Sequence, residues 1–163
     1  MAAQKNMLIN VDICTGCRLC ELICSLVKEK ESNPAKARIH NEFYLMEGMR
    51  VPRVCINCVD PACVTSCPTE ALVKNNVTGM VTLDDDACNN CLACIEACKY
   101  GSIRLTPDDV IIKCDTCGGD PECVKICETQ AITFADRKPQ TLTQARKGVA
   151  TWAEVKKTEE VLA

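Results

Sequence analysis

Sixteen cysteines, arranged as four groups of four, constrain the fold of this 163-residue chain more than any other feature. The first and third groups share the spacing C-x2-C-x2-C-x3-C, and the second and fourth have a wider gap before their third cysteine. No cysteine lies outside these groups, which we call quartets one to four. Their members are Cys14, Cys17, Cys20 and Cys24; Cys55, Cys58, Cys63 and Cys67; Cys88, Cys91, Cys94 and Cys98; and Cys114, Cys117, Cys123 and Cys127. Such a regular repeat in a short chain indicates either a bound metal or a disulfide framework.

The remainder of the chain offers little material for an ordinary hydrophobic core. The hydrophobic fraction of 47% includes the cysteines, and aromatic residues make up only 3% of the chain. Aromatic side chains normally supply much of the buried area, so a group bound by the cysteines has to replace part of the core. We find no nucleophile with its base, no phosphate-cradling glycine loop and no dinucleotide fingerprint. The sequence therefore predicts no catalytic residue and a chain that is not an enzyme by itself.

The cellular compartment separates the two interpretations of the cysteines. Residues 1–12 contain one short apolar run, Met7 to Ile9, which is too brief for a signal peptide. No segment approaches the length of a membrane span. We therefore expect a cytoplasmic protein with reduced thiols, in which disulfides are rare.

Spacing then selects the metal. The run C-x2-C-x2-C-x3-C holds cubane clusters in bacterial-type ferredoxins. Zinc sites typically use two separate C-x2-C knuckles instead of four cysteines within one short segment. Rieske ligation needs two histidines for one cluster, and this chain has only His40. We therefore expect four [4Fe–4S] clusters that use all sixteen cysteines, with a zinc-binding interaction module as the alternative.

Charge argues against nucleic acid as a partner, because the formal net charge is −3. Sixteen thiolates and four oxidised cluster cores would lower this to about −11. Several cations lie near cysteines in the sequence and could offset part of that charge, unless they are merely solvated surface groups. They are Arg18, Arg53, Lys99, Lys113 and Lys125.

The segments between the quartets indicate which quartets belong together. A two-cluster ferredoxin unit has the order β-α-β-β-α-β, with a hairpin between its two motifs. Turn residues and the alternating run from Met80 to Leu83 fit that hairpin between quartets two and three. Expected strands at Met7–Val11 and Ala131–Phe134 flank quartets one and four, and would be the antiparallel opening and closing strands of a second unit.

The predicted fold is therefore α+β, with one ferredoxin unit inserted in another and a C-terminal helix. We expect an outer unit formed by residues 1–50 and 105–137, an inserted unit at 51–104, and a helical tail at 138–163. In such units the fourth cysteine of each motif ligates the neighbouring cluster. The nested ligand sets are Cys14, Cys17, Cys20 with Cys127; Cys114, Cys117, Cys123 with Cys24; Cys55, Cys58, Cys63 with Cys98; and Cys88, Cys91, Cys94 with Cys67. The alternative is sequential pairing, quartet one with two and three with four.

This nested layout resembles the electron-transfer subunits of molybdenum and tungsten pterin enzymes. The stretch from Val51 to Cys63, followed by Cys67-Pro68-Thr69-Glu70-Ala71, is similar to their second motif. The continuation of quartet one through Asn33 to Ile39 resembles the small polyferredoxins of the tungsten aldehyde:ferredoxin oxidoreductase family and of the ATP-independent (class II) benzoyl-CoA reductase. The resemblance covers residues 7–136. Proline follows the last cysteine of a quartet only at Cys67, which departs from the usual pattern.

The resemblance implies one-electron transfer within a hetero-oligomeric complex. Electrons would pass between a tungsten- or molybdenum-pterin catalytic subunit and a ferredoxin or a flavin/NAD subunit, with no membrane span in this chain. One alternative is that the chain is the iron–sulfur subunit of a molybdopterin reductase, a formate dehydrogenase or a hydrogenase. The other is a freestanding soluble polyferredoxin.

Two cysteine-free segments complete the prediction. Pro34 should end any helix that begins near Cys24, and residues 38–45 should form a strand that covers a cluster or contacts a partner. Apolar residues recur at helical spacing between Gln144 and Leu162, and include the only tryptophan, Trp152. This helix would pack on its own fold or dock on a partner subunit.

Overall fold

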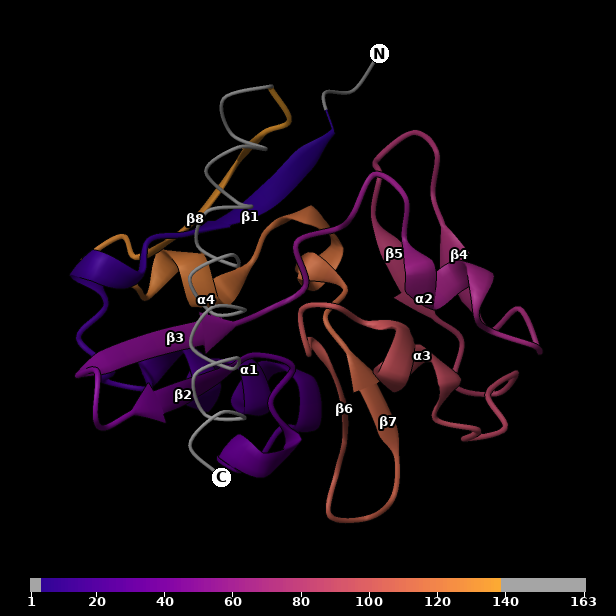
Figure 1. The fold of residues 1–163 in the computed structure, drawn as a ribbon, viewed down its shortest axis with the longest axis horizontal. Helices are drawn as coiled ribbons and strands as arrows, with labels where there is room; N and C mark the ends of the chain where they lie inside the picture. Colours follow the sequence, from indigo (N-terminus) through magenta and orange to yellow (C-terminus); the bar gives the residue numbers. More distant parts are fainter. Residues whose placement is uncertain (1–3, 139–163) are drawn as a thin grey trace.

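The computed structural model describes residues 4–138, a small α+β fold of short helices and two-stranded antiparallel sheets (Figure 1). The strands of this region are β1 (Lys5–Ile9), β2 (His40–Tyr44), β3 (Met49–Arg53), β4 (Leu72–Lys74), β5 (Val81–Leu83), β6 (Ile103–Leu105), β7 (Ile111–Lys113) and β8 (Ile132–Asp136). The α-helices are α1 (Leu19–Glu29), α2 (Ala62–Thr65), α3 (Ala93–Ala97) and α4 (Glu122–Lys125). Short 3-10 turns lie at Val11–Ile13, Pro34–Lys36 and Thr116–Gly119. The expected tail helix lies outside the described residues.

The first and last strands of the described region pair with each other. β1 runs antiparallel to β8, with Lys5 opposite Asp136 and Ile9 opposite Ile132. β1 starts earlier and ends earlier than expected, because the side chain of Asn10 caps the following turn by accepting a hydrogen bond from the Asp12 backbone N–H. The antiparallel contact between the segments that flank quartets one and four is therefore present, as the sequence indicated.

The other strands form three hairpins. β4 pairs with β5 between quartets two and three, in the position that the turn residues indicated. β2 pairs with β3, and β6 pairs with β7. The expected unit boundaries at residues 50/51 and 104/105 thus fall inside β3 and β6. Each of these strands is hydrogen-bonded to a neighbour on the other side of its boundary, so hairpins join the inner and outer segments.

Helix α1 and the segment after it follow the sequence signals. The helix ends at Glu29, where Lys30 adopts a left-handed conformation and its backbone N–H bonds to the carbonyl of Leu26. The following strand, β2, lies over quartet one. The side chain of Asn41 donates from Nδ2 to the Cys20 sulfur at 3.3 Å. This segment therefore covers a cysteine, one of the two roles considered for it.

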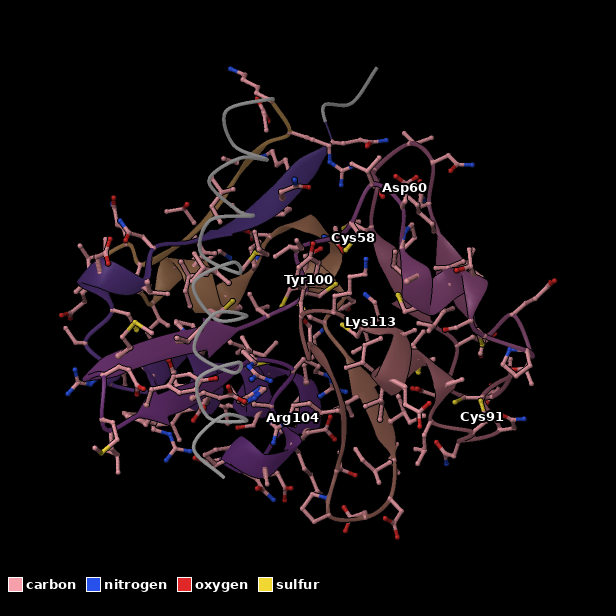
Figure 2. All side chains as sticks on the ribbon, viewed as in Figure 1. Cys58, Asp60, Cys91, Tyr100, Arg104 and Lys113 are labelled. Carbon is pink, nitrogen blue, oxygen red and sulfur yellow. The ribbon has the colours of Figure 1, made fainter. Side chains whose placement is uncertain are left out.

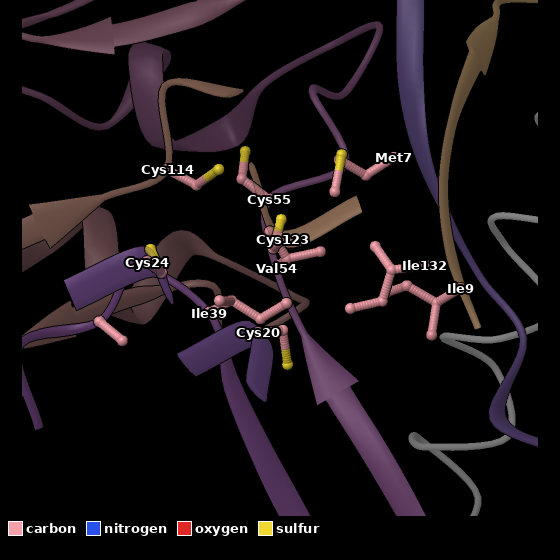
Figure 3. Packing of buried hydrophobic residues seen from close by; sticks show 11 residues of the cluster. Met7, Ile9, Cys20, Cys24, Ile39, Val54, Cys55, Cys114, Cys123 and Ile132 are labelled. Atoms are coloured by element: carbon pink, nitrogen blue, oxygen red, sulfur yellow. The ribbon is translucent and has the colours of Figure 1, made fainter. Parts of the chain in front are cut away.

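The described interior contains a larger and a smaller group of buried residues, together with a third group of only Tyr44 and Val51, and cysteines are prominent in the larger one (Figure 3). Its eleven members are Met7, Ile9, Cys20, Cys24, Ala37, Ile39, Val54, Cys55, Cys114, Cys123 and Ile132. The smaller group contains Leu72, Val81, Cys94, Ile103 and Ile111. Thiols thus occupy interior positions where most proteins of this size place large apolar side chains. Within residues 4–138, the structure contains no helix of the length and hydropathy that crossing a membrane requires.

Candidate metal centres

A shared backbone conformation shapes the first part of each quartet. The residue before the second cysteine is left-handed in all four, with φ of 69° at Gly16, 52° at Asn57, 54° at Asn90 and 53° at Thr116. This conformation favours glycine and asparagine, which occupy three of the four positions. It turns the chain sharply between two cysteines, so that both thiols reach the same side of the loop. Sequence analysis missed this feature, although the Gly and Asn residues were a signal for it.

The last part of three quartets is equally regular. Three residues after the final cysteine, the backbone is again left-handed at Glu70, Gly101 and Gln130. The residues that directly follow these cysteines are Pro68, Lys99 and Glu128, so this turn does not depend on the proline. Quartet one differs because Cys24 lies inside the longer helix α1.

The outer quartets contribute their cysteines to two cavities. The lining of one cavity includes Cys14, Cys17, Cys20 and Cys127. The lining of the other includes Cys24, Cys114, Cys117 and Cys123. In each case the fourth cysteine comes from the distant quartet. Helix α1 packs against α4 and brings these segments together.

The inner quartets approach each other in the same crossed manner. Cys58, Cys63 and Cys98 line one cavity, and the Cys55 thiolate adds its charge to those of this group. Cys94 lies within electrostatic reach of Cys67, Cys88 and Cys91. Helix α2 packs against α3 to join quartets two and three.

Each set of four thiols suits a cubane cluster. A cubane has an iron at each of four corners, and each iron takes its own thiolate. Sets of four separated thiols around a cavity therefore fit a [4Fe–4S] cluster.

Burial sets the electrostatics of the thiols. Desolvation, assisted by neighbouring thiolates, raises the pKa of Cys58 and Cys63 to about 11 and that of Cys123 to about 12. Burial also raises the pKa of Cys114 far above its ordinary value. Thiolates at these positions need positive charge nearby, which iron supplies.

Hydrogen bonds to sulfur oppose this effect of burial. Three cysteine sulfurs accept hydrogen bonds from backbone N–H groups. The donors and acceptors are Arg38 and Cys24 (3.3 Å), Ser102 and Cys98 (3.4 Å), and Thr116 and Cys114 (3.4 Å). Such hydrogen bonds stabilise the thiolate form and raise the reduction potential of a bound cluster.

At Cys67, the effect of burial on the pKa is outweighed by hydrogen bonds. Burial acts to raise its pKa, but hydrogen bonds from Thr69, Ala71 and Leu72 outweigh it and the pKa is lowered. The exposed cysteines Cys17 and Cys91 belong to quartets one and three. Access from solvent is therefore greatest at these two cysteines.

Contacts also run between the cysteine sets. Figure 3 shows the Cys114 thiol directed toward Cys55, and after burial the charge of Cys55 contributes most to raising the pKa of Cys114. The charge of Cys20, which lines the neighbouring cavity, likewise raises the pKa of Cys123. The cysteine sets are thus neighbours in the interior.

Comparisons with known proteins agree with this geometry. Residues 46–137 match the family model described as a 4Fe-4S dicluster domain. The polyferredoxin-like subunit of an aliphatic sulfonate oxidoreductase from Pyrococcus furiosus is 45% identical over 74% of this chain and 70% of its own length. The beta subunit of an NADH-dependent phenylglyoxylate dehydrogenase from Aromatoleum evansii is 36% identical over 73% of this chain, but over only 27% of its own length.

Among solved structures, a chain of the active-site complex BamBC of benzoyl coenzyme A reductase, in complex with 1,5-dienoyl-CoA, matches over 97% of this chain and 99% of its own. The TM-score is 0.49 and the sequence identity is 22%. The family match and the relatives' descriptions identify an iron–sulfur, ferredoxin-like electron-transfer subunit. With its cysteine quartets and its matched span, the chain belongs to the 4Fe-4S dicluster domain family.

Proposed function

We propose that this chain carries electrons one at a time through four [4Fe–4S] clusters. The electrons pass between a tungsten-pterin catalytic subunit of the aldehyde oxidoreductase type and a ferredoxin or a flavin/NAD subunit. The observation that carries the proposal is the pair of cavities lined by four cysteines, three from one quartet and one from its distant partner. The cysteines fill every iron position, so the clusters have no open site for a substrate.

In this proposal the ligand sets are the nested ones, and each of two ferredoxin units, one inserted in the other, holds two clusters. Cluster 1 is bound by Cys14, Cys17, Cys20 and Cys127. Cluster 2 is bound by Cys24, Cys114, Cys117 and Cys123. Cluster 3 is bound by Cys55, Cys58, Cys63 and Cys98. Cluster 4 is bound by Cys67, Cys88, Cys91 and Cys94.

The contacts between cysteines support a linear order for these clusters. All four of Cys20, Cys123, Cys55 and Cys114 belong to the larger core group. In the proposed ligand sets, the first two would bring clusters 1 and 2 together, and the last two would bring clusters 2 and 3 together. Cysteines of clusters 3 and 4 pack around the smaller core group. The exposed Cys17 and Cys91 then mark the two ends of the path, where partners exchange electrons.

Names of relatives support a role as a subunit of a larger complex. One relative is a polyferredoxin-like subunit of a sulfonate oxidoreductase, and another belongs to an NADH-dependent dehydrogenase. We propose tungsten as the metal of the catalytic subunit because residues 51–63 and 33–39 resemble the electron-transfer subunits of molybdenum and tungsten pterin enzymes. The nicotinamide-linked relative supports a flavin/NAD subunit as one possible electron acceptor.

Elemental analysis of the complex, purified anaerobically from its native host, tests the catalytic partner. We expect about sixteen iron atoms per chain, together with tungsten. Molybdenum in place of tungsten would assign the chain to a molybdopterin reductase, formate dehydrogenase or hydrogenase. Iron without either metal and without a stoichiometric partner would indicate a freestanding carrier, and zinc in place of iron would contradict the proposal.

Two double variants test the crossed ligand sets. Cys17→Ala with Cys127→Ala removes two ligands from the same cluster, so about twelve iron atoms should remain. Cys17→Ala with Cys24→Ala removes ligands from two clusters, so iron should fall to about eight. If each quartet instead held its own cluster, the two iron contents would be exchanged. Each pair combines Cys17 with the final cysteine of a quartet, which makes the variants matched controls.

A further inference from the structure

Lys113 has a surrounding that is unusual for a lysine. It is the last residue of β7, and only 6% of it is exposed. Its Nζ donates hydrogen bonds to the carbonyl oxygens of Val81, in β5, and of Cys114. Figure 2 shows Lys113 near the centre of the molecule. Burying an ammonium group is costly unless an opposite charge lies nearby.

No carboxylate among the described residues forms an ion pair with this ammonium. Two carboxylates that line the same pocket have cations of their own, because Asp115 pairs with Lys28 at 2.6 Å and Asp108 pairs with Lys36 at 2.7 Å. Asp85 also lines this pocket but forms no ion pair with Lys113.

Two cysteines of different ligand sets lie close to the ammonium. Its Nζ is 2.8 Å from the carbonyl oxygen of Cys114, and it also bonds to the carbonyl of Val81, a member of the smaller core group against which Cys63 packs. In the proposed ligand sets, these cysteines bind two different clusters, 2 and 3. An oxidised [4Fe–4S] core with four thiolates has a net charge of −2. Lys113 thus lies within electrostatic reach of two anionic groups.

Lys113 differs in this respect from the other cations that lie near cysteines in the sequence. Arg18 and Lys125 have about half of their side chains exposed, and each pairs with a carboxylate. Arg53 is largely buried but pairs with Glu42. Lys99 is exposed. Solvent or a carboxylate therefore screens the charge at these four positions, whereas the Lys113 ammonium is buried and bonds to two backbone carbonyl oxygens.

We propose that Lys113 is the shared counter-charge of the two central clusters and raises the reduction potentials of both. The inference rests on the proposed four-cluster function. Adding an electron to a cluster makes it more negative, and a buried cation stabilises that reduced form. The interior has a low effective dielectric constant, so the stabilisation is larger than a surface lysine could provide. Lys113 does not exchange electrons itself. Its charge stabilises the reduced forms of clusters 2 and 3, so electrons on the path spend more time on these two clusters.

A redox titration of the intact complex, followed by electron paramagnetic resonance, tests this role. Lys113→Gln keeps a hydrogen-bond donor but removes the charge, whereas Lys113→Arg keeps the charge. At a fixed potential, we expect Lys113→Gln to lower the ratio of reduced to oxidised cluster by about tenfold, or 59 mV, at two of the four clusters. Lys113→Arg should retain the wild-type ratios. Lys125→Gln is the matched control, since it removes an exposed charge near other cysteines, and its ratios should not change.

The outcomes separate this inference from the function on which it rests. A wild-type complex without four reducible clusters would contradict the proposed function itself. Full iron content in Lys113→Gln with unchanged ratios would overturn the role of Lys113 alone. So would a shift of the same size in Lys125→Gln, because that would show a general effect of net charge. If Lys113→Gln loses iron, Lys113→Arg decides: wild-type ratios support the role, and shifted ratios at the two clusters overturn it.

Discussion

Removing the iron with a chelator is expected to abolish the native fold of the protein. Five of the eleven residues in the larger core group are cysteines, so much of this group is built from small side chains that would hold the clusters. Without clusters, these thiols leave cavities where the metal and sulfide had filled the interior, and each cavity costs stability in proportion to its volume. Binding energy of a structural metal site is folding energy when the site does not exist in the unfolded chain.

Far-ultraviolet circular dichroism and visible absorbance, recorded together during anaerobic chelation, measure this effect. We expect the helical signal and the iron–sulfur absorbance to disappear in parallel. Adding iron and sulfide back to the reduced chain should restore both. A metal-free protein that keeps a cooperative thermal transition would contradict the expectation, because the apolar residues would then suffice for folding.

Loss of the buried ligand Cys114 should be far more damaging than loss of the exposed ligand Cys91. Cys114 belongs to the larger core group and lies against Cys55 at the proposed junction of clusters 2 and 3. Cys114→Ala should interrupt the path in its middle and destabilise the fold by about 2–5 kcal/mol, the range for loss of a large buried group. Cys91 lies on an exposed loop at one end. Cys91→Ala should leave clusters 1 to 3 and most of the stability in place.

Thermal unfolding distinguishes the two variants. Iron content serves as the control, because each variant removes a ligand of one cluster and about twelve iron atoms should remain in both. Electron transfer between the partners should be lost in both, since the path is broken in its middle by Cys114→Ala and at its end by Cys91→Ala. Equal losses of stability in both variants would contradict the difference in burial on which the prediction depends.

Sequence patterns predicted the features that depend on local spacing. The quartets identified the cluster type, and the α+β class followed from the strands and helices between them. The hairpin β4–β5 was predictable because turn residues separate two short alternating runs. The pairing of β1 with β8 was predictable from their positions just outside the first and last quartets.

Features that depend on tertiary contacts were not predictable in this way. The pairing of β6 with β7 joins two three-residue strands across the expected unit boundary, and strands this short have weak periodicity. Lys113 ends an Ile-Ile-Lys strand, and its sequence neighbours do not reveal the carbonyl of Val81 that accepts its hydrogen bond. Asn41 reaches Cys20 only because the β2–β3 hairpin folds over quartet one.

The pairing of β1 with β8 also determines the order in which the protein can be assembled during synthesis. β1 is the first described strand to leave the ribosome, but its partner is the last. Contacts between distant segments form late, because closing a long loop costs entropy. The β4–β5 hairpin, and the contact of α2 with α3, can form while the C-terminal part is still being made. The β1–β8 contact can therefore form only after the polypeptide has been synthesised through Asp136.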